Sequence, residues 1–484
     1  MSEEVTEEIY TNLKNVTKEF SSLIQDTLGT HLILTNPTID GLCASSILFE
    51  LLTNKENGIQ VSFRKSLRNL QKIKERKYDN IWLLNYKITK EHIEELKKSN
   101  KTIFIINYKM DKEVFAMING KKEDRIHILS SVSLKMNERF LSSSGLLYFV
   151  AKAYEKDYYR YGVQALLGAL SEGQIEISSQ EFIGFNRFIL NELIDANVLS
   201  LVHGTRIRGR ETKPIHLALM HSIDPYFPGL TGNEGACTSF LSRIGITMKD
   251  QNNEWRKISD LTKQEMQTLN DALISLIVSE GKNTDDINKL IGPIYVLKNE
   301  QKESYTKNLD EFLLLIEGAV NLELYGLVFA VLLGNRTFQY NQIIYEIDNY
   351  YGESSQIIGE IENNQITLEN KKYFLVVEGL SSLNNHNVLK KLCQSGKFDL
   401  NKPIFFLFKK RKYSEIFVYE SPVQKIKGYL IYPIFARLKD ERIIEEISDK
   451  DEFFVVKILN ESLDKTYTEI EKKLDYHYHG KKKQ

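Results

Sequence analysis

The sequence predicts an α/β protein that begins with a doubly wound, mainly parallel sheet. Two observations support this fold class. Short apolar runs alternate with helical segments over the first 180 residues, an order typical of parallel βαβ units. Strand-like runs return after about residue 335 and predict a second, smaller α/β domain beyond a helical middle region. A chain of 484 residues is long enough for roughly two to four domains that each bury a core.

The predicted N-terminal sheet consists of compact apolar segments, which are followed by helical ones. The strands are expected at 31–36, 59–65, 80–87, 102–109 and 125–131. Helices are expected in GLCASSILFELL, in TKEHIEELKKSN, from about 144 to 156, and in YGVQALLGALSEGQ with an end near Gly173. Short continuous apolar runs of this kind are typical of buried strands.

The middle and C-terminal regions follow different patterns. Residues 180–330 are predicted to be mainly helical with loops, and the polar stretch 250–310 is predicted to be exposed and punctuated by helices. Beyond it, strands are expected in QITLEN, KKYFLVVEGL, KPIFFLFKK, SEIFVYES and GYLIYPIFARL, before a charged C-terminal helix. These patterns predict four segments: 1–178, 179–334, 335–455 and 456–484.

The overall composition argues against several functional classes. Lys and Arg number 64 against 65 Asp and Glu, a formal net charge of -1, so no overall positive field attracts nucleic acid. The longest apolar runs fall well short of the roughly 20 residues that cross a bilayer. The acidic N-terminus lacks a signal-peptide pattern, and the three cysteines lack the spacing of a zinc site or a disulfide framework. We therefore expect a cytoplasmic protein without membrane association.

Polar residues follow the predicted strands at the edge of the sheet where α/β proteins carry their chemistry. One aspartate, in the pair Asp40-Gly41, follows the first strand, and asparagines follow the strands at 80–87 and 102–109. A glutamate follows a later buried helix. The candidate site residues are Asn36, Thr38, Asp40, Asn85, Asn107, Tyr108, Lys109 and Glu172.

This pattern of strand ends resembles the DHH phosphoesterase superfamily, and most closely its RecJ-like nucleases and their archaeal relatives. In that family the corresponding strands end in Asp-x-Asp-Gly, in Asp and in Asp-His-His, and these residues bind two divalent metals, manganese or magnesium, for phosphodiester hydrolysis. Asp40 keeps its aspartate, Asn36 takes a neighbouring polar position, and Glu172 stands where relatives usually carry aspartate. According to the resemblance, the remaining ligand positions are altered in this chain, where they are occupied by Thr38, Asn85, Asn107, Tyr108 and Lys109.

The resemblance extends along most of the chain. SSSGLLYF matches the Ser/Ala-Gly helix of the family, and residues 310–336 look like its connecting helix with a heavily altered motif. The C-terminal strands are placed like the accessory DHHA1 domain, although its Gly-Gly-His substrate motif is absent from the sequence. The resemblance implies a DHH-like domain at 1–178, a helical connecting region at 179–334 and a DHHA1-like domain at 335–455, with a charged helix and tail at 456–484.

The substitutions remove most of the charge that two divalent metals need. Metals of this class are held by hard oxygen donors, usually with several carboxylates that balance the cations. Among the matched positions only Asp40 and Glu172 are acidic, and the Lys109 ammonium repels cations. We therefore expect a catalytically inactive protein without a cofactor. Mn2+ or Mg2+ is expected only if an active phosphoesterase holds its metals in another way.

Plainer interpretations of the same residues stay open. Asp40 at the start of a helix is typical of an N-cap or a first-turn carboxylate, and asparagines after strands are common turn residues. Glu172 near a helix end is typical of a solvated charge. No two histidines have the spacing of a ligand pair on a helix, apart from His477 and His479 near the C-terminus.

Two basic segments are candidates for weak contact with nucleic acid. The segment 203–213 carries its basic residues among glycines, which suits a phosphate-binding loop. The segment 408–417 adds aromatic residues that can stack on bases. Taken alone, a segment of either kind is more often a solvated loop than a binding site. The candidate residues are Arg206, Arg208, Arg210, Lys213, Lys409, Lys410 and Arg411.

The predicted function follows from the family resemblance. Archaeal RecJ-like proteins and the DHH-derived subunit of the CMG replicative helicase bind GINS and support the MCM helicase, and several have eroded metal sites. The resemblance implies a GINS-associated component of the DNA replication helicase, with GINS, MCM and single-stranded DNA as candidate partners. Two alternatives stay open. One is a diverged, active DHH phosphoesterase or single-strand-specific exonuclease, and the other is a nucleotide-sensing regulator that uses the emptied cleft.

Overall fold

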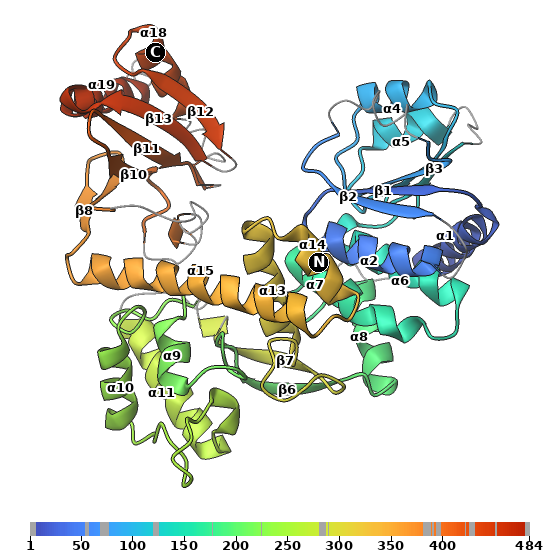
Figure 1. Cartoon of the computed structure of the whole chain (residues 1–484), viewed down its shortest axis with the longest axis horizontal. Helices are drawn as coiled ribbons and strands as arrows, with labels where there is room; N and C mark the ends of the chain where they lie inside the picture. The colour runs from blue at the N-terminus through green and yellow to red at the C-terminus, as the bar shows by residue number, and fades with distance from the viewer. Residues whose placement is uncertain are drawn as a thin grey trace. The chain divides into compact units, whose positions relative to one another are not determined.

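The computed structural model describes most of the chain and divides it into two compact units. The first unit is formed by Met1–Thr212 with Ile287–Ile347, and the second by Lys213–Asp286 with Asp348–Gln484. Figure 1 shows their helices and strands in chain order. None of the described helices is both long and apolar enough to cross a membrane. The described residues are 6–53, 58–67, 77–119, 125–176, 178–223, 225–279, 287–288, 290–380, 389, 392–393, 398–421, 423–424, 431–450 and 453–479.

The first unit contains a five-stranded parallel sheet. Its strands are β1 (His31–Thr35), β2 (Ile59–Phe63), β3 (Asn80–Leu84), β4 (Thr102–Ile106) and β5 (Ile126–Leu129). They lie in the order β2-β1-β3-β4-β5, and all the paired strands are parallel. The predicted parallel sheet is confirmed, and its five strands fall within the expected segments.

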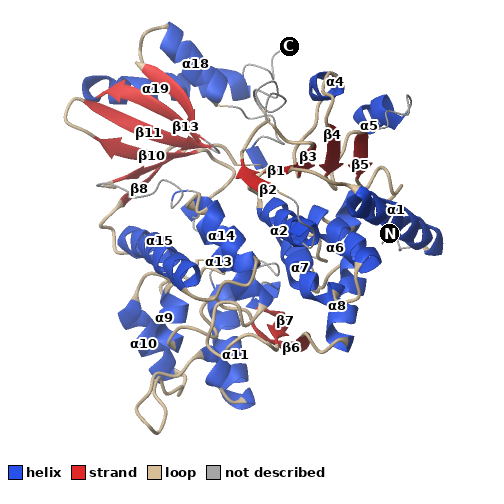
Figure 2. Cartoon of the chain, turned by 45° about the vertical axis from the view of Figure 1, so that its right-hand side comes forward, coloured by secondary structure: helices blue, strands red, loops and turns tan. Residues whose placement is uncertain are grey.

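Helices cover both faces of this sheet, as a doubly wound fold requires. Figures 1 and 2 show helices on each face of the sheet. The first face carries α4 (Lys90–Lys97) and α5 (Lys112–Asn119). The second face carries α1 (Glu7–Asp26), α2 (Ile39–Thr53) and α6 (Ser143–Tyr154).

Alternate residues of each strand supply the two layers of the core, because successive side chains of a strand point to opposite faces. Leu32 and Leu34 of β1 belong to the same buried cluster as Ile93 of α4. On the opposite face the Trp82 ring stacks on Phe104, with 3.8 Å between ring centroids. The central strands β1, β3 and β4 are buried on both sides. Because they run in parallel, their carboxyl ends emerge at one edge of the sheet.

Along the sequence, helices dominate the segment that follows the strands of the first sheet and precedes those of the second. They are α7 (Gly162–Ser171), α8 (Phe185–Asp195), α9 (Ile215–Met220), α10 (Glu234–Arg243), α11 (Lys263–Ser279), α13 (Leu309–Asn321), α14 (Tyr325–Leu332) and α15 (Phe338–Glu362). Single 3-10 turns occur at Glu138–Phe140, Tyr158–Tyr161, Ile258–Asp260 and Asn460–Ser462.

Two strands in this region depart from the expected helices and loops. β6 (Leu199–Thr205) and β7 (Ile291–Leu297) form an antiparallel pair. The prediction of an exposed stretch at 250–310 is therefore wrong for β7, in which five of the seven residues are buried. The two partners are separated by a long inserted segment, so the sequence offers no hairpin signal between them.

The expectation of a single connecting helix at 310–336 is also wrong. The chain forms α13 and α14, and Glu323 in the turn between them adopts a φ of 59°. A left-handed residue interrupts the helical hydrogen-bond pattern, so two short helices replace one long helix.

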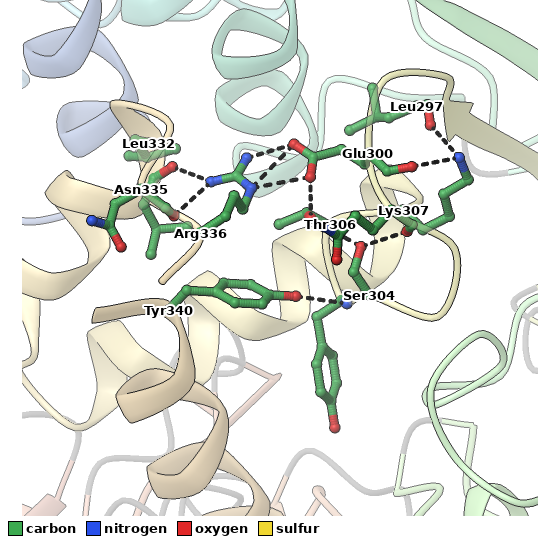
Figure 3. Close-up of polar contacts among 12 residues, drawn as sticks. Leu297, Glu300, Ser304, Thr306, Lys307, Leu332, Asn335, Arg336 and Tyr340 are labelled. Carbon is green, nitrogen blue, oxygen red and sulfur yellow. Dashed lines mark hydrogen bonds and ion pairs between the residues drawn. The ribbon is translucent and has the colours of Figure 1, made fainter. Parts of the chain in front are cut away.

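The end of α14 is fixed by the polar contacts in Figure 3. The Arg336 guanidinium donates to both carboxylate oxygens of Glu300, with its Nη2 2.6 Å from Oε1. It also donates to the Val331 carbonyl at 2.7 Å, which accepts from the Gly334 backbone N–H at 3.1 Å as well. Thr306 Oγ1 donates to the same Glu300 carboxylate at 2.7 Å. One ion pair thereby joins the loop after β7 to the helix pair.

The second unit contains a six-stranded mixed sheet, and Figure 1 draws it at the red end of the chain. Its strands are β8 (Thr367–Asn370), β9 (Leu375–Glu378), β10 (Ile404–Lys409), β11 (Tyr413–Tyr419), β12 (Glu446–Lys450) and β13 (Phe453–Leu459). They lie in the order β12-β13-β11-β10-β9-β8, and only β9 and β10 pair in parallel. Two helices, α18 (Tyr432–Asp440) and α19 (Leu463–His479), share a buried cluster with the sheet.

Two expectations for this unit need correction. The segment GYLIYPIFARL was expected as a strand, but its described part forms α18, with a proline in the first helical turn. Its residues 428–430 lie outside the described part. Proline is favoured at a helix start because its fixed φ suits the helix and its missing N–H has no partner there. In addition, β13 occupies the start of the segment expected to be a charged helix, and α19 begins only at Leu463. The tail 480–484 is outside the described residues.

Candidate functional site

The polar residues at the strand ends meet at one edge of the parallel sheet. β1, β3 and β4 are adjacent, and their last residues Thr35, Leu84 and Ile106 lie side by side in the register. The residues that follow these strands therefore surround a common cavity of about 560 Å³. Its lining consists of Asn36, Asn85, Lys87, Ile88, Asn107, Tyr108, Lys109, Met110, Asp111, Glu138 and Glu172.

Asn85 has a backbone reason to be asparagine. Its φ is 57°, in the left-handed region that asparagine tolerates better than most residues. Its side-chain amide donates to Thr38 Oγ1 at 2.7 Å and accepts from Ser143 Oγ at 3.1 Å. Both polar atoms of the Asn85 amide thus have partners from this chain.

The other two asparagines join neighbouring strand ends. Asn36 Nδ2 donates to the Asn85 carbonyl at 3.1 Å, and Asn107 Nδ2 donates to the Tyr86 carbonyl at 2.6 Å. The Asn107 side-chain oxygen also accepts from the Lys109 backbone N–H at 3.1 Å. An aspartate in either place has no N–H to donate to these carbonyls, so the amide supplies a bond that a carboxylate lacks.

Asp40 is completely buried and binds the start of a different helix. It lies in the first turn of α2, but its carboxylate accepts from the backbone N–H groups of Ser143 and Ser144, both at 2.9 Å. Ser144 Oγ donates to the same carboxylate at 2.6 Å. These N–H groups begin α6 and have no acceptor within their own helix. The plainer interpretation is right about the first turn and wrong about which helix the carboxylate caps.

Glu172 carries the second retained carboxylate, and it is largely buried. Its side chain is 19% exposed, so the interpretation as a solvated charge is wrong. The Tyr108 hydroxyl donates to Glu172 Oε2, and Lys109 Nζ lies 3.6 Å from the same oxygen. Burial and the nearby Asp40 carboxylate raise the pKa of Glu172. Burial and the bond to Glu172 also raise the pKa of Tyr108, which keeps its hydroxyl protonated as the donor.

The residues present do not fit the two-metal site that the family resemblance implies. Both carboxylate oxygens of Asp40 accept hydrogen bonds from the start of α6, and Lys109 places a positive charge beside Glu172. Two divalent cations need several free carboxylates. Within the described part of the chain, no cluster of three His, Cys, Asp or Glu residues is placed to hold a metal.

Sequence reasoning missed several residues of this region. Lys87, Asp111 and Glu138 line the cavity, and Ser143 and Ser144 bind Asp40. One signal was available for Lys87, because the segments at 80–87 and 102–109 both end in Asn-Tyr-Lys. The serines belong to SSSGLLYF, but nothing in the sequence pairs them with Asp40, which lies 103 and 104 positions earlier.

The basic residues of the segment 203–213 are engaged in contacts within their own units. Arg206 forms a two-pronged ion pair with Asp310, at 3.0 and 2.6 Å. Arg210 pairs with Glu211 at 3.2 Å and Lys213 with Asp348 at 2.8 Å, while Arg208 is buried. None of these basic residues is among those that line the cavity. These contacts give the segment a structural role, and its contact with nucleic acid stays a prediction.

The segment 408–417 forms the end of β10, a tight turn and most of β11. Lys409 pairs with Glu378, Lys410 pairs with Glu415 at 2.8 Å, and Arg411 is exposed. The candidate residues of the two basic segments therefore differ in their contacts. Most of them have carboxylate partners, whereas Arg411 lies at the surface.

Comparisons with known proteins agree with this architecture. A family model described as the DHH-CID domain matches residues 207–291. The crystal structure of CDC45 from Entamoeba histolytica superposes with a TM-score of 0.63 at 13% identity, over 96% of this chain and 98% of that one. A structure of exonuclease RecJ bound to manganese gives a TM-score of 0.48 at 11% identity, over 94% and 93% of the two chains. The search of curated proteins found no match. The chain therefore has the fold of the DHH superfamily, in the form that the CDC45 structure displays.

Proposed function

We propose that this protein is a non-catalytic DHH-fold scaffold that works as a GINS-associated component of a DNA replication helicase. One observation carries the proposal. At the strand ends where the family holds its metals, the polar groups of this chain bind one another, and Lys109 supplies a positive charge beside Glu172. A site whose donors and charges are matched internally has lost the ligands that bind and activate a metal-bound water.

The distribution of charge supports a structural use of this edge. A buried carboxylate without a counter-ion is costly, and it becomes tolerable when N–H donors or a cation face it. Asp40 faces the N–H groups of α6, and Glu172 faces Lys109 and Tyr108. Asparagine at the remaining positions avoids further negative charge and keeps the hydrogen bonds.

The overall fold supports a binding role in replication. The superposition on CDC45 extends over almost the whole of both chains, so the scaffold is retained although the strand ends are altered. The resemblance of the strand ends to the DHH-derived subunit of the CMG helicase points to GINS and MCM as partners. Single-stranded DNA is a further candidate partner.

An affinity purification tests this proposal. The tagged full-length chain is expressed in its native cells, and the recovered proteins are quantified by mass spectrometry against cells that carry the tag alone. Enrichment of GINS and MCM subunits is expected, and it should persist after nuclease treatment because the contacts are between proteins. A folded, well-expressed chain that enriches neither complex contradicts the scaffold role.

A nuclease assay separates the scaffold from an active phosphoesterase. The purified chain is incubated with Mn2+ and a labelled single-stranded oligonucleotide, alongside Asp40→Asn and Lys109→Gln variants. No cleavage is expected from any of the three. Cleavage that Asp40→Asn abolishes and Lys109→Gln retains assigns catalysis to this edge and overturns the proposal. A calorimetric titration with Mn2+ provides a second readout, in which tight binding has the same meaning.

A further inference from the structure

The turn between β10 and β11 carries the most concentrated positive charge of the second unit's sheet. Residues 409–412 are four consecutive basic residues, which we call the basic turn. The first two have carboxylate partners, Glu378 and Glu415. Arg411 and Lys412 are exposed, and no described residue pairs with either side chain. Two cations at the tip thus remain available to an outside anion.

The backbone of the basic turn is held in place from the end of β13. Asn460 Nδ2 donates to the Lys410 carbonyl at 2.9 Å, and the Asn460 backbone N–H donates to the Lys412 carbonyl at 3.3 Å. The Asn460 side-chain oxygen accepts from Ser414 Oγ at 2.8 Å. Three hydrogen bonds from one residue fix both sides of the turn, so its cations are presented on a backbone that is already ordered.

A third cation lies beside the basic turn. Lys457 Nζ is 4.3 Å from the centroid of the Tyr413 ring, and Lys410 Nζ is 5.4 Å from it. The ring attracts both ammonium groups through its π electrons. The ring keeps Lys457 close to the turn and leaves its positive charge in place, whereas a carboxylate partner neutralises such a charge.

We propose that the basic turn binds the phosphate backbone of single-stranded nucleic acid, with Arg411 and Lys412 as the contacting residues. This inference rests on the proposed function, since it assigns the DNA contact of the scaffold to one turn. The chemistry favours phosphates over an acidic protein segment. Protein interfaces are anchored by buried aromatic or aliphatic groups, whereas the tip offers cations and Asn460, and the Tyr413 ring is occupied by two lysines. Such contacts position a strand without reading its bases.

The expected effect follows from counterion release. A single-stranded nucleic acid contributes a slope of about 0.7 per neutralised phosphate to the dependence of log affinity on log salt concentration. Loss of two contacts in Arg411→Gln/Lys412→Gln should make the slope shallower by about 1.4. At about 0.1 M salt the same two contacts correspond to roughly 25-fold weaker binding.

Fluorescence anisotropy with a labelled oligothymidine tests the proposal on the full-length chain. The matched control is Lys439→Gln/Lys465→Gln, which removes the same charge from two exposed lysines of the same unit and should leave affinity and slope unchanged. Asn460→Ala should weaken binding without changing the slope, because it loosens the turn and retains every charge. Wild-type binding by the Arg411→Gln/Lys412→Gln variant, or equal weakening in the control, overturns the assignment.

Two further measurements separate the alternatives. Polyglutamate that displaces the oligonucleotide at equal charge concentration, with the same dependence on Arg411 and Lys412, assigns the turn to an acidic protein segment and overturns the nucleic-acid proposal. The affinity purification is read independently. A chain that binds oligothymidine through the turn but recovers no helicase subunits removes the scaffold role alone. A chain that recovers GINS and binds no oligonucleotide removes the present inference alone.

Discussion

Asp40→Ala should destabilise the first unit strongly in the absence of any metal. The Asp40 carboxylate accepts from two buried N–H groups and one hydroxyl. The Ser144 hydroxyl has a second acceptor in the Ala165 carbonyl at 3.5 Å, so its loss is partly compensated. The two N–H groups have no such alternative, and each buried donor without an acceptor costs about 1–3 kcal/mol. We expect a loss of about 4 kcal/mol in the free energy of unfolding.

Intrinsic fluorescence can follow this loss in the correct unit. The chain has two tryptophans: Trp82 is completely buried in the first sheet, and Trp255 in the second unit is 47% exposed. In a Trp255→Phe background, urea unfolding monitored through Trp82 reports the first unit. Glu138→Ala is the matched control, because this carboxylate lines the same cavity but is exposed, and it should change stability by less than about 0.5 kcal/mol.

One result would refute the reasoning. If Asp40 serves a metal, its removal should leave the metal-free protein as stable as before, and added Mn2+ should stabilise only the wild-type chain. A difference in stability between the wild-type and Asp40→Ala chains that appears only with Mn2+ is therefore incompatible with the role assigned to Asp40. Equal destabilisation with EDTA and with Mn2+ is the expected outcome.

Three further predictions concern other parts of the fold. Arg336→Ala should lower the free energy of unfolding of the first unit by about 2 kcal/mol, measured by urea titration, because it removes a two-pronged ion pair and a helix-end contact. Burial raises the pKa of Glu311 to about 8, so the folded chain keeps a proton that the unfolded chain releases near pH 4.5. Stability should fall as pH rises through this interval and level off above about 8, and Glu311→Gln should flatten that slope in unfolding curves from pH 5 to 9. Gly359→Ala should lower the melting temperature, because its Cβ meets the Gly232 carbonyl oxygen at 2.5 Å, whereas Gly352→Ala on the same helix meets nothing within 4 Å and should raise it.

The N-terminal sheet was predictable because its signals are local. The central strands β1, β3 and β4 are short, mainly apolar runs, and the burial of both their faces leaves no competing pattern. The strand pair β6 and β7 was not predictable in the same way, since its two partners are far apart in the sequence. The helix α18 was mistaken for a strand because its apolar residues cluster around Pro433, which stands in the first helical turn.

For the candidate site, the sequence predicted which residues converge and not what they bind. Parallel strands place their ends together, so the proximity of Asn36, Asn85 and Asn107 follows from the fold alone. The partner of Asp40 depends on how α6 packs, and that contact joins residues 103 positions apart. The same limit applies to Arg206, which looks like a phosphate ligand in the sequence and forms an ion pair with Asp310 in the structure.

The ammonium group beside Glu172 belongs to a side chain of the protein itself. A metal-dependent edge of this kind gains and loses positive charge as the supply of divalent ions changes, and a chelator can strip it. Lys109 is attached to the backbone, so its charge is present at every concentration of manganese or magnesium. The ends of these strands consequently keep one electrostatic state under metal starvation and metal excess, which suits a part that must hold its shape at all times.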